Sequence, residues 1–158
     1  LLVSKLLAGV FVSILQVYAF LLIASFWNII PPISGYFTIL PALIFSGLML
    51  GSLGMFLSSA IKQLENFAGV MNFVIFPMFF ASSALYPLWK IEETSEWLYY
   101  VCLYNPFTYA VEIIRFSMYA ELTQHYSIGI IIFTIIFLTL AILGYDPSRG
   151  TMQKKGGK

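Results

Sequence analysis

Residues 6–61 read LLAGVFVSILQVYAFLLIASFWNIIPPISGYFTILPALIFSGLMLGSLGMFLSSAI, and none of their side chains is charged. One crossing of a bilayer needs about 20 apolar residues, so this stretch is long enough for two crossings. The pair Pro31-Pro32, followed by Gly35, gives a strong turn signal near its middle. The stretch therefore predicts two membrane helices, at residues 6–30 and 36–60.

The composition of the whole chain agrees with a membrane protein. Of its 158 residues, 60% are hydrophobic and only 9% are charged, and the mean hydropathy is +0.90. A soluble domain is roughly half apolar and a quarter charged. A water-soluble fold of this size cannot bury so much apolar surface, so lipid is the expected solvent.

Two further spans follow a short polar break. The segment 61–66, IKQLEN, predicts a tight connecting loop. Residues 67–89 are again uncharged and predict a third span, which Pro77 is expected to bend. A fourth span is predicted at residues 126–144, and a polar tail follows it at residues 146–158. The expected fold is thus an all-α integral membrane domain over residues 1–145.

The segment between the third and fourth spans is crowded with aromatic side chains, which prefer the headgroup level of a bilayer. Asn105 is a good helix cap, and Pro106 suits the first position of a new helix. We therefore expect two short interfacial or re-entrant helices, at residues 95–104 and 106–122. The alternative is a full fifth span, which would place Glu112 and Arg115 at membrane depth at a cost of a few kcal/mol each.

Lysine and arginine residues set the orientation of short-looped membrane proteins, since they are enriched on the cytoplasmic side. If Lys5 is cytoplasmic, only Lys90 and Arg115 fall outside. The predicted cytoplasmic cations are Lys5, Lys62, Arg149, Lys154, Lys155 and Lys158. The tail is then cytoplasmic, and the outer segment is acidic.

Other features restrict the function classes. The net charge is +1 and no basic stripe is present, which argues against a nucleic-acid partner. The single cysteine, Cys102, excludes an internal disulfide. The chain opens at Leu1 directly before a span, so we expect it to begin part-way through a longer protein.

Small residues recur on one face of the second predicted helix, at intervals of four, three and four. Such a face allows helix backbones to approach closely in membranes. The simplest interpretation is packing against a neighbouring span of the same chain, and a subunit interface or a moving seam is the alternative. The residues of this face are Gly47, Gly51, Gly54 and Ser58.

A membrane enzyme is the competing class, and its chemistry is weakly represented. Ser82-Ser83 lacks the glycine-flanked setting of a serine nucleophile, and His125 is the only histidine. The carboxylates Glu92, Glu93 and Glu96 have no further ligand at fixed spacing, so a solvated acidic face is expected instead of a metal site. No catalytic residue and no metal site is therefore predicted.

The energy for any transport must then come from outside this chain. The four predicted spans carry no charge, which disfavours a proton-coupled pump or a cation channel. The chain also lacks a glycine-rich phosphate loop of the Walker type. No bound cofactor is predicted here, and ATP is expected on a partner subunit. Glu112 and Arg115, three residues apart on a helix, predict a local ion pair, with a role in substrate entry or gating as the alternative.

The run 72–115 carries a family resemblance. It contains Pro77 in a span, small residues at 81–84, then Tyr86-Pro87-Leu88, Trp97-Leu98, Asn105-Pro106-Phe107-Thr108-Tyr109 and Arg115. This order resembles the C-terminal signature of the type-2 ATP-binding-cassette exporter permeases. Two positions depart from it, since the family often has Ser-Gly at 82–83 and a proline at 96.

The resemblance implies four of the six spans of a permease half, which moves a drug, lipid or glycan outward across a plasma or bacterial inner membrane. The implied partners are a cytoplasmic ATPase subunit and a second permease half, with a second copy of this chain expected. Lys62, Gln63 and Glu65 would supply a secondary ATPase contact. The implied outer re-entrant gate comprises Tyr86, Pro87, Trp97, Asn105, Pro106, Tyr109, Glu112 and Arg115. The alternative function is a non-transport membrane scaffold or a channel-like subunit.

Overall fold

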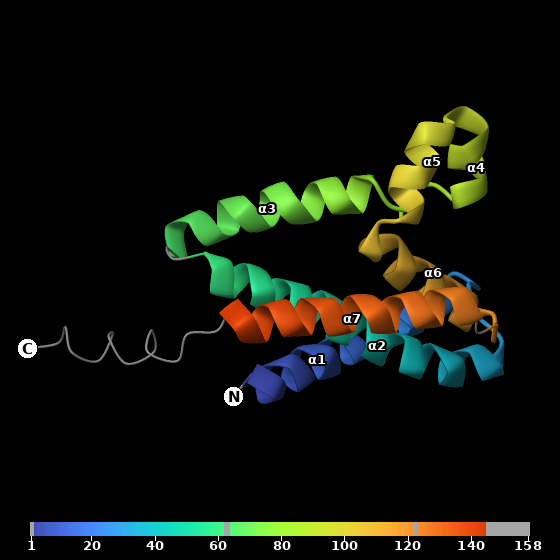
Figure 1. The fold of residues 1–158 in the computed structure, drawn as a ribbon. Coiled ribbons are helices and arrows are strands. Elements are labelled where there is room, and N and C mark those ends of the chain that lie inside the picture. Colours follow the sequence, from blue (N-terminus) through green and yellow to red (C-terminus); the bar gives the residue numbers. More distant parts are fainter. Residues whose placement is uncertain (1, 62–63, 122, 145–158) are drawn as a thin grey trace, which may run out of the picture.

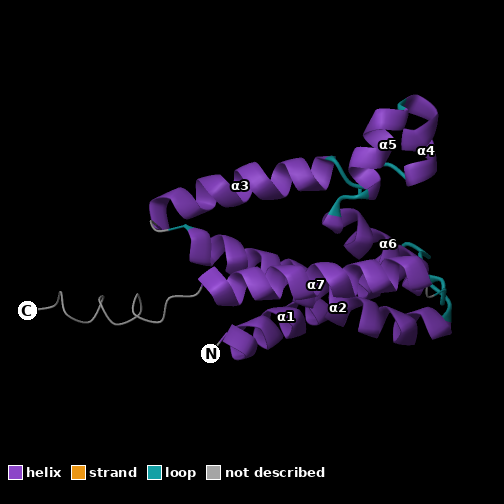
Figure 2. Cartoon of the chain, in the orientation of Figure 1, coloured by secondary structure: helices purple, strands orange, loops and turns teal. Residues whose placement is uncertain are grey.

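A computed structural model describes residues 2–61, 64–121 and 123–144. These residues form helices and turns, and none of them belongs to a strand (Figure 2). The helices, in chain order, are α1 (Leu2–Ser25), α2 (Ile33–Ala60), α3 (Leu64–Phe80), α4 (Leu88–Thr94), α5 (Glu96–Leu103), α6 (Pro106–Met118) and α7 (Gln124–Gly144). The predicted all-α membrane fold is confirmed.

Three of these helices, α1, α2 and α7, are both long and apolar enough to cross a bilayer. The third predicted span corresponds to α3, which has 17 residues and is apolar from Ala68 to Phe80. At about 1.5 Å per residue its length is about 25 Å, somewhat less than the roughly 30 Å of a hydrocarbon core. If α3 enters a bilayer, the segment after it must therefore complete the crossing.

The bundle is built around α2, which packs against α1, α6 and α7 (Figure 1). One buried cluster joins α2, α6 and α7 through Met49, Ile113 and Ile130. A second joins α1 and α2 through Leu21, Ile39 and Leu43. The core thus lies on both sides of α2, and the last turns of α1 and the first turns of α7 pack against the same helix.

Polar contacts fix the first turns of α2. The Tyr18 hydroxyl of α1 donates a hydrogen bond to the Tyr36 carbonyl at 2.5 Å, and the Thr38 hydroxyl donates one to the Ser117 carbonyl of α6, also at 2.5 Å. Gly35 lies so close to the Met118 backbone that an added methyl group would overlap its carbonyl. The start of α2 is therefore clamped between α1 and the end of α6.

The third span is shorter than predicted, and this is a correction to the expected boundary at residue 89. The helix ends at Phe80, residues 81–87 form a turn, and α4 follows as a separate short helix that the sequence did not predict. The predicted helix at 95–104 corresponds to α5, and the one at 106–122 corresponds to α6, which ends earlier, at Met118. We call residues 81–87 the exit turn.

The helix α3 stands apart from the bundle in Figure 1, joined to it through its two ends. Beyond the exit turn, α4 and α5 form a hairpin that projects from the rest of the molecule, past the end of α3. From the end of α5 the chain turns back, and α6 runs between α3 and the bundle to the turn before α7 (Figure 1). This path makes α6 the link between α3 and the other spans.

Candidate functional site

The candidate site is the junction at which the exit turn meets the start of α6. Asn105 lies there, at the corner between α5 and α6, and is buried. Its side-chain oxygen accepts a hydrogen bond from the Phe107 amide at 2.9 Å, and Pro106 occupies the first turn of α6. The helix start thus has the cap and the proline that the sequence indicates.

Besides capping α6, the Asn105 side chain binds the end of α3. Its amide nitrogen donates hydrogen bonds to the carbonyls of Met78 and Ala81, both at 2.7 Å. These carbonyls belong to the last turn of α3 and to the exit turn, where a helix has no partners of its own for such groups. One side chain therefore caps the start of α6 and the end of α3 at once.

Two hydrogen bonds hold the backbone of Ser83, one at its amide and one at its carbonyl. Its amide donates to the Thr108 hydroxyl at 3.2 Å, and its carbonyl accepts from Arg115 Nη2 at 2.9 Å. Arg115 also donates from Nη1 to Glu112 Oε1 at 2.7 Å, so the predicted ion pair is present. The Glu112 side chain is 5% exposed and that of Arg115 is 36% exposed.

We call the bonds from Asn105, Thr108 and Arg115 to residues 78–83 the exit-turn clamp. They come from three levels of α6, one and then two helical turns apart, and all are directed at the backbone of one short segment. An ion pair whose carboxylate is buried is sensitive to loss of either partner, since a lone charge cannot be solvated there. Together these hydrogen bonds fix the position of the end of α3 relative to α6.

Tyr109 lies on the opposite side of α6, against α7. Its ring contacts Gly129 so closely that a methyl group there would overlap it, and it packs edge-on against Tyr126 and Phe133. The ring of His125, whose side chain is exposed, is also close to it. Tyr109 therefore joins α6 to α7 and does not contribute to the clamp.

The remaining residues of the predicted gate lie outside the clamp. Tyr86 and Trp97 are exposed, at 61% and 74%, and Pro87 precedes the first residue of α4. The structure thus brings together Asn105, Pro106, Glu112 and Arg115. It leaves Tyr86 in the exit turn and Trp97 on the hairpin of α4 and α5. The acidic residues of that hairpin, Glu92, Glu93 and Glu96, are exposed.

Sequence reasoning did not identify two members of the clamp, Ser83 and Thr108. Both are completely buried. In the sequence, Ser83 is one of the small residues 81–84 and lacks the setting of a nucleophile, and Thr108 is part of the run after Asn105. The available signal was the polarity of Ser82, Ser83 and Thr108 within otherwise apolar surroundings, because buried polar groups in membranes need partners.

Only part of the predicted packing face of α2 contacts another helix. Gly47 meets Val10 of α1, whose Cγ2 would be 3.1 Å from an added Cβ, and Gly51 meets Leu6 at 3.6 Å. Gly54 has no heavy atom within 4 Å of such a Cβ, and Ser58 is exposed. The first two residues of the face therefore lie against α1, and the last two do not.

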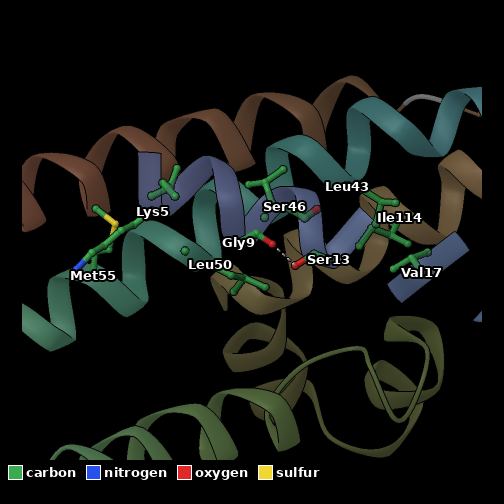
Figure 3. A pocket seen from close by; sticks show the side chains of 13 residues that line it. Lys5, Gly9, Ser13, Val17, Leu43, Ser46, Leu50, Met55 and Ile114 are labelled. Atoms are coloured by element: carbon green, nitrogen blue, oxygen red, sulfur yellow. Dashed lines mark hydrogen bonds between the residues drawn. The ribbon is translucent and has the colours of Figure 1, made fainter. Parts of the chain in front are cut away.

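A groove of about 350 Å³ runs along this contact between α1 and α2 (Figure 3). Its lining is largely apolar, with Lys5 at one end and the hydroxyl-bearing residues Ser13 and Ser46 along it. The Ser13 hydroxyl donates to the Gly9 carbonyl at 2.9 Å. The groove lies between α1 and α2, with Ile114 of α6 also lining it, and none of the clamp residues contributes to it.

Two other predicted sites fall at the edge of the described chain. Lys62 and Gln63 lie outside the described residues, and so does the tail 145–158. Glu65 belongs to the first turn of α3. Within the residues that the structure describes, no group of three or more histidine, cysteine or acidic residues is placed to hold a metal ion.

Comparison with known families gives one match, which extends from α1 through α6 and ends before α7. The model of the family described as ABC-2 type transporter matches residues 1–119. Neither the curated proteins nor the solved structures gave a match. The matched region covers three quarters of the chain and includes every residue of the exit-turn clamp. The chain therefore belongs to the ABC-2 type transporter family, as a membrane-embedded permease component of an ABC transporter.

Proposed function

We propose that this permease component exports an amphipathic substrate of the drug, lipid or glycan type, outward across a plasma or bacterial inner membrane. ATP is held and hydrolysed by a cytoplasmic ATPase subunit, and two permease halves, both copies of this chain, form the path. The observation that supports an outward path with a controlled outer end is the exit-turn clamp. It joins a helix that stands apart from the bundle to the segment that closes the outer side.

In this proposal the chain works by changing shape and performs no covalent chemistry. A partner can shift a conformational equilibrium only through contacts that differ between the two states. ATPase closure would move the cytoplasmic end of α3, near Lys62, Gln63 and Glu65, the proposed secondary ATPase contact. Because the clamp fixes the other end of α3 to α6, a tilt of α3 would also move α6 and the hairpin of α4 and α5.

The proposed topology has the N-terminal end of α1 and residues 146–158 in the cytoplasm, with α4 and α5 on the outer side. Residues 1–145 would form the membrane domain. The exposed aromatic side chains of the hairpin, among them Trp89 and Trp97, suit the headgroup level of the outer leaflet. Tyr86, Pro87 and Trp97 would then form the part of the gate that meets lipid or substrate.

Two substitutions of Asn105 test the proposal. Asn105→Asp keeps an oxygen that can accept from the Phe107 amide, but it removes both donors to Met78 and Ala81. Asn105→Ala removes the cap as well, which costs about 1 kcal/mol. We expect both variants to bind the ATPase subunit, because the cytoplasmic contacts lie elsewhere, and to lose ATP-dependent transport of amphipathic dyes in inside-out vesicles.

The matched control is Glu92→Gln on the exposed outer hairpin, which should transport like the parent. Full export by both Asn105 variants would show that the clamp has no role in transport. A parent complex that hydrolyses ATP but transports none of the dyes, lipids or glycans supplied would favour the scaffold function instead.

A further inference from the structure

The groove between α1 and α2 has the dimensions of a site for one hydrocarbon chain (Figure 3). On α1 it extends from Lys5 to Val17, which is a rise of about 18 Å at about 1.5 Å per residue. One leaflet contributes about 15 Å, half of the roughly 30 Å hydrocarbon core. The volume of about 350 Å³ also falls within the range of small-molecule sites. The groove is therefore about as long as one leaflet is deep.

Lys5 is an exposed cation at one end of this groove. No ion pair joins it to an acidic residue in the described part of the chain. Residues 6–61 carry no charged side chain, so no later residue of α1 or α2 neutralises it. A lysine at a membrane surface attracts anionic groups. This end of the groove therefore favours an anionic head group.

Ser46 places a buried hydroxyl on the wall of the same groove. The residue is 3% exposed, and its hydroxyl has no hydrogen bond among the described residues. By contrast, the hydroxyls of Ser13 and Ser52 donate to the Gly9 and Leu48 carbonyls of their own helices. A buried hydroxyl without a partner is unfavourable, and rotation about one side-chain torsion is enough to turn it toward a ligand. Ser46 thus indicates a ligand with a hydrogen-bonding group inside its apolar part.

The separation of Lys5 and Ser46 defines the layout of such a ligand. Gly51 lies against Leu6, and earlier residues of α2 lie beside later residues of α1. At about 1.5 Å per residue, Ser46 is therefore about 9 Å farther along the groove than the backbone of Lys5. The Lys5 side chain leans back toward the start of α1, which lengthens this separation. The head group and the second polar group of the ligand must be at least that far apart.

We propose that this groove binds a single-chain amphipathic anion, with its head group on Lys5 and a mid-chain oxygen hydrogen-bonded to Ser46. The proposal rests on the proposed function and narrows its substrate to this chemical class. A hydroxylated fatty acid is a simple member of the class. Its carboxylate accepts hydrogen bonds from the lysine ammonium, and its chain hydroxyl can exchange one with the serine.

Ricinoleate and oleate are a matched pair of probes, because they differ only in one mid-chain hydroxyl. Binding of radiolabelled ricinoleate is measured by scintillation proximity on the full-length permease in phosphatidylcholine nanodiscs, with empty nanodiscs as background. Unlabelled oleate and ricinoleate compete for the site. We expect the parent to prefer ricinoleate about three- to tenfold, which is the effect of one hydrogen bond. Equal affinity for the two probes would overturn the proposal.

Two polar substitutions test the two contacts separately. Ser46→Ala should bind ricinoleate as weakly as oleate, whereas Ser52→Ala, on the same helix but outside the groove, should keep the preference. Lys5→Gln should weaken both probes several-fold, and Lys90→Gln, on the exposed surface of α4, should weaken neither. A preference that survives Ser46→Ala, or equal losses in the two lysine variants, contradicts the assigned contacts.

Gly9 allows the groove to be filled without displacing a helix. It lines the groove, and no heavy atom lies within 4 Å of an added Cβ. Gly9→Leu should therefore abolish specific ricinoleate binding. Gly54→Leu, which also enters open space but lies outside the groove, should keep it. If Gly9→Leu does not fold while Gly54→Leu does, a protein segment fills the groove and the ligand site is refuted.

The outcomes separate this inference from the proposed function. Displacement of ricinoleate by phosphatidylglycerol added to the nanodiscs, without preference over oleate, identifies a membrane phospholipid as the occupant and refutes the proposal. Unchanged binding in the Lys5, Ser46 and Gly9 variants refutes the site and leaves the exporter proposal to the Asn105 variants. Binding that depends on these residues, in a complex that exports no amphipathic substrate, supports the site and refutes the exporter proposal.

Discussion

Arg115 combines two tasks, since it neutralises the buried Glu112 and holds the Ser83 carbonyl. Arg115→Gln should lower the free energy of unfolding by about 3 kcal/mol, because it leaves a buried carboxylate unpaired. The double variant Glu112→Gln/Arg115→Gln should lose less, since no lone charge remains. Denaturation in detergent, followed by circular dichroism, measures both. A double variant less stable than Arg115→Gln alone would contradict the unpaired-charge explanation.

Ala120 is a residue whose backbone conformation suits glycine better. It has a φ of 62° at the end of α6, where the Glu121 amide bonds back to the Phe116 carbonyl at 3.0 Å. A left-handed residue with a Cβ costs about 1 kcal/mol, so Ala120→Gly should raise the melting temperature in detergent. Ala110→Gly, inside the same helix, should lower it. Equal shifts for the two variants would exclude the conformational explanation.

At the scale of helices, the contact between α1 and α2 depends on two glycines of one face. Gly47→Leu would force α1 away, because Val10 lies within 3.1 Å of the added Cβ, whereas Gly54→Leu enters open space. We expect the first variant to reduce the folded fraction in size-exclusion chromatography by several-fold and the second to resemble the parent. If Gly54→Leu is the more damaging variant, the face has a partner other than α1.

A helix boundary can be predicted from the sequence where residues next to it in the chain determine it. The break at Asn105-Pro106 follows from a cap and a proline that are adjacent in the chain, and α5 and α6 begin close to the predicted residues. The end of α3 was not predictable in this way. Its last carbonyls are bound by Asn105, 24 and 27 residues later, and an apolar run up to Trp89 conceals that tertiary contact.

The candidate site was predicted only in part for a similar reason. Glu112 and Arg115 are one helical turn apart, so their ion pair can be read from spacing. Ser83 and Thr108 meet across the exit turn, and no periodicity relates them. The family resemblance places Tyr86 and Trp97 in one gate with Asn105 and Arg115. In the structure Tyr86 lies in the exit turn and Trp97 on the hairpin of α4 and α5, and both side chains are exposed.

For the whole molecule, the arrangement of positive residues predicts which ends of the helices share a side of the membrane. Lys5→Cys and Glu93→Cys should react with an impermeant maleimide from opposite sides, since both positions are exposed. Cys102→Ala removes the native thiol, which is a slow competitor because burial raises its pKa and lowers its thiolate fraction at neutral pH. Labelling of both positions from the same side would contradict the four-span topology.

The exit-turn clamp also determines how freely this part of the sequence can vary. Thr108 and Arg115 bind the backbone amide and carbonyl of Ser83. The Ser83 hydroxyl is buried and has no hydrogen bond among the described residues. Ser83→Ala or Ser83→Gly should therefore preserve export, and Ser83→Pro, which lacks the amide hydrogen, should abolish it. At position 83, where the resembled family signature often has glycine, we therefore expect serine and glycine to be interchangeable, because the clamp binds the backbone and not the side chain.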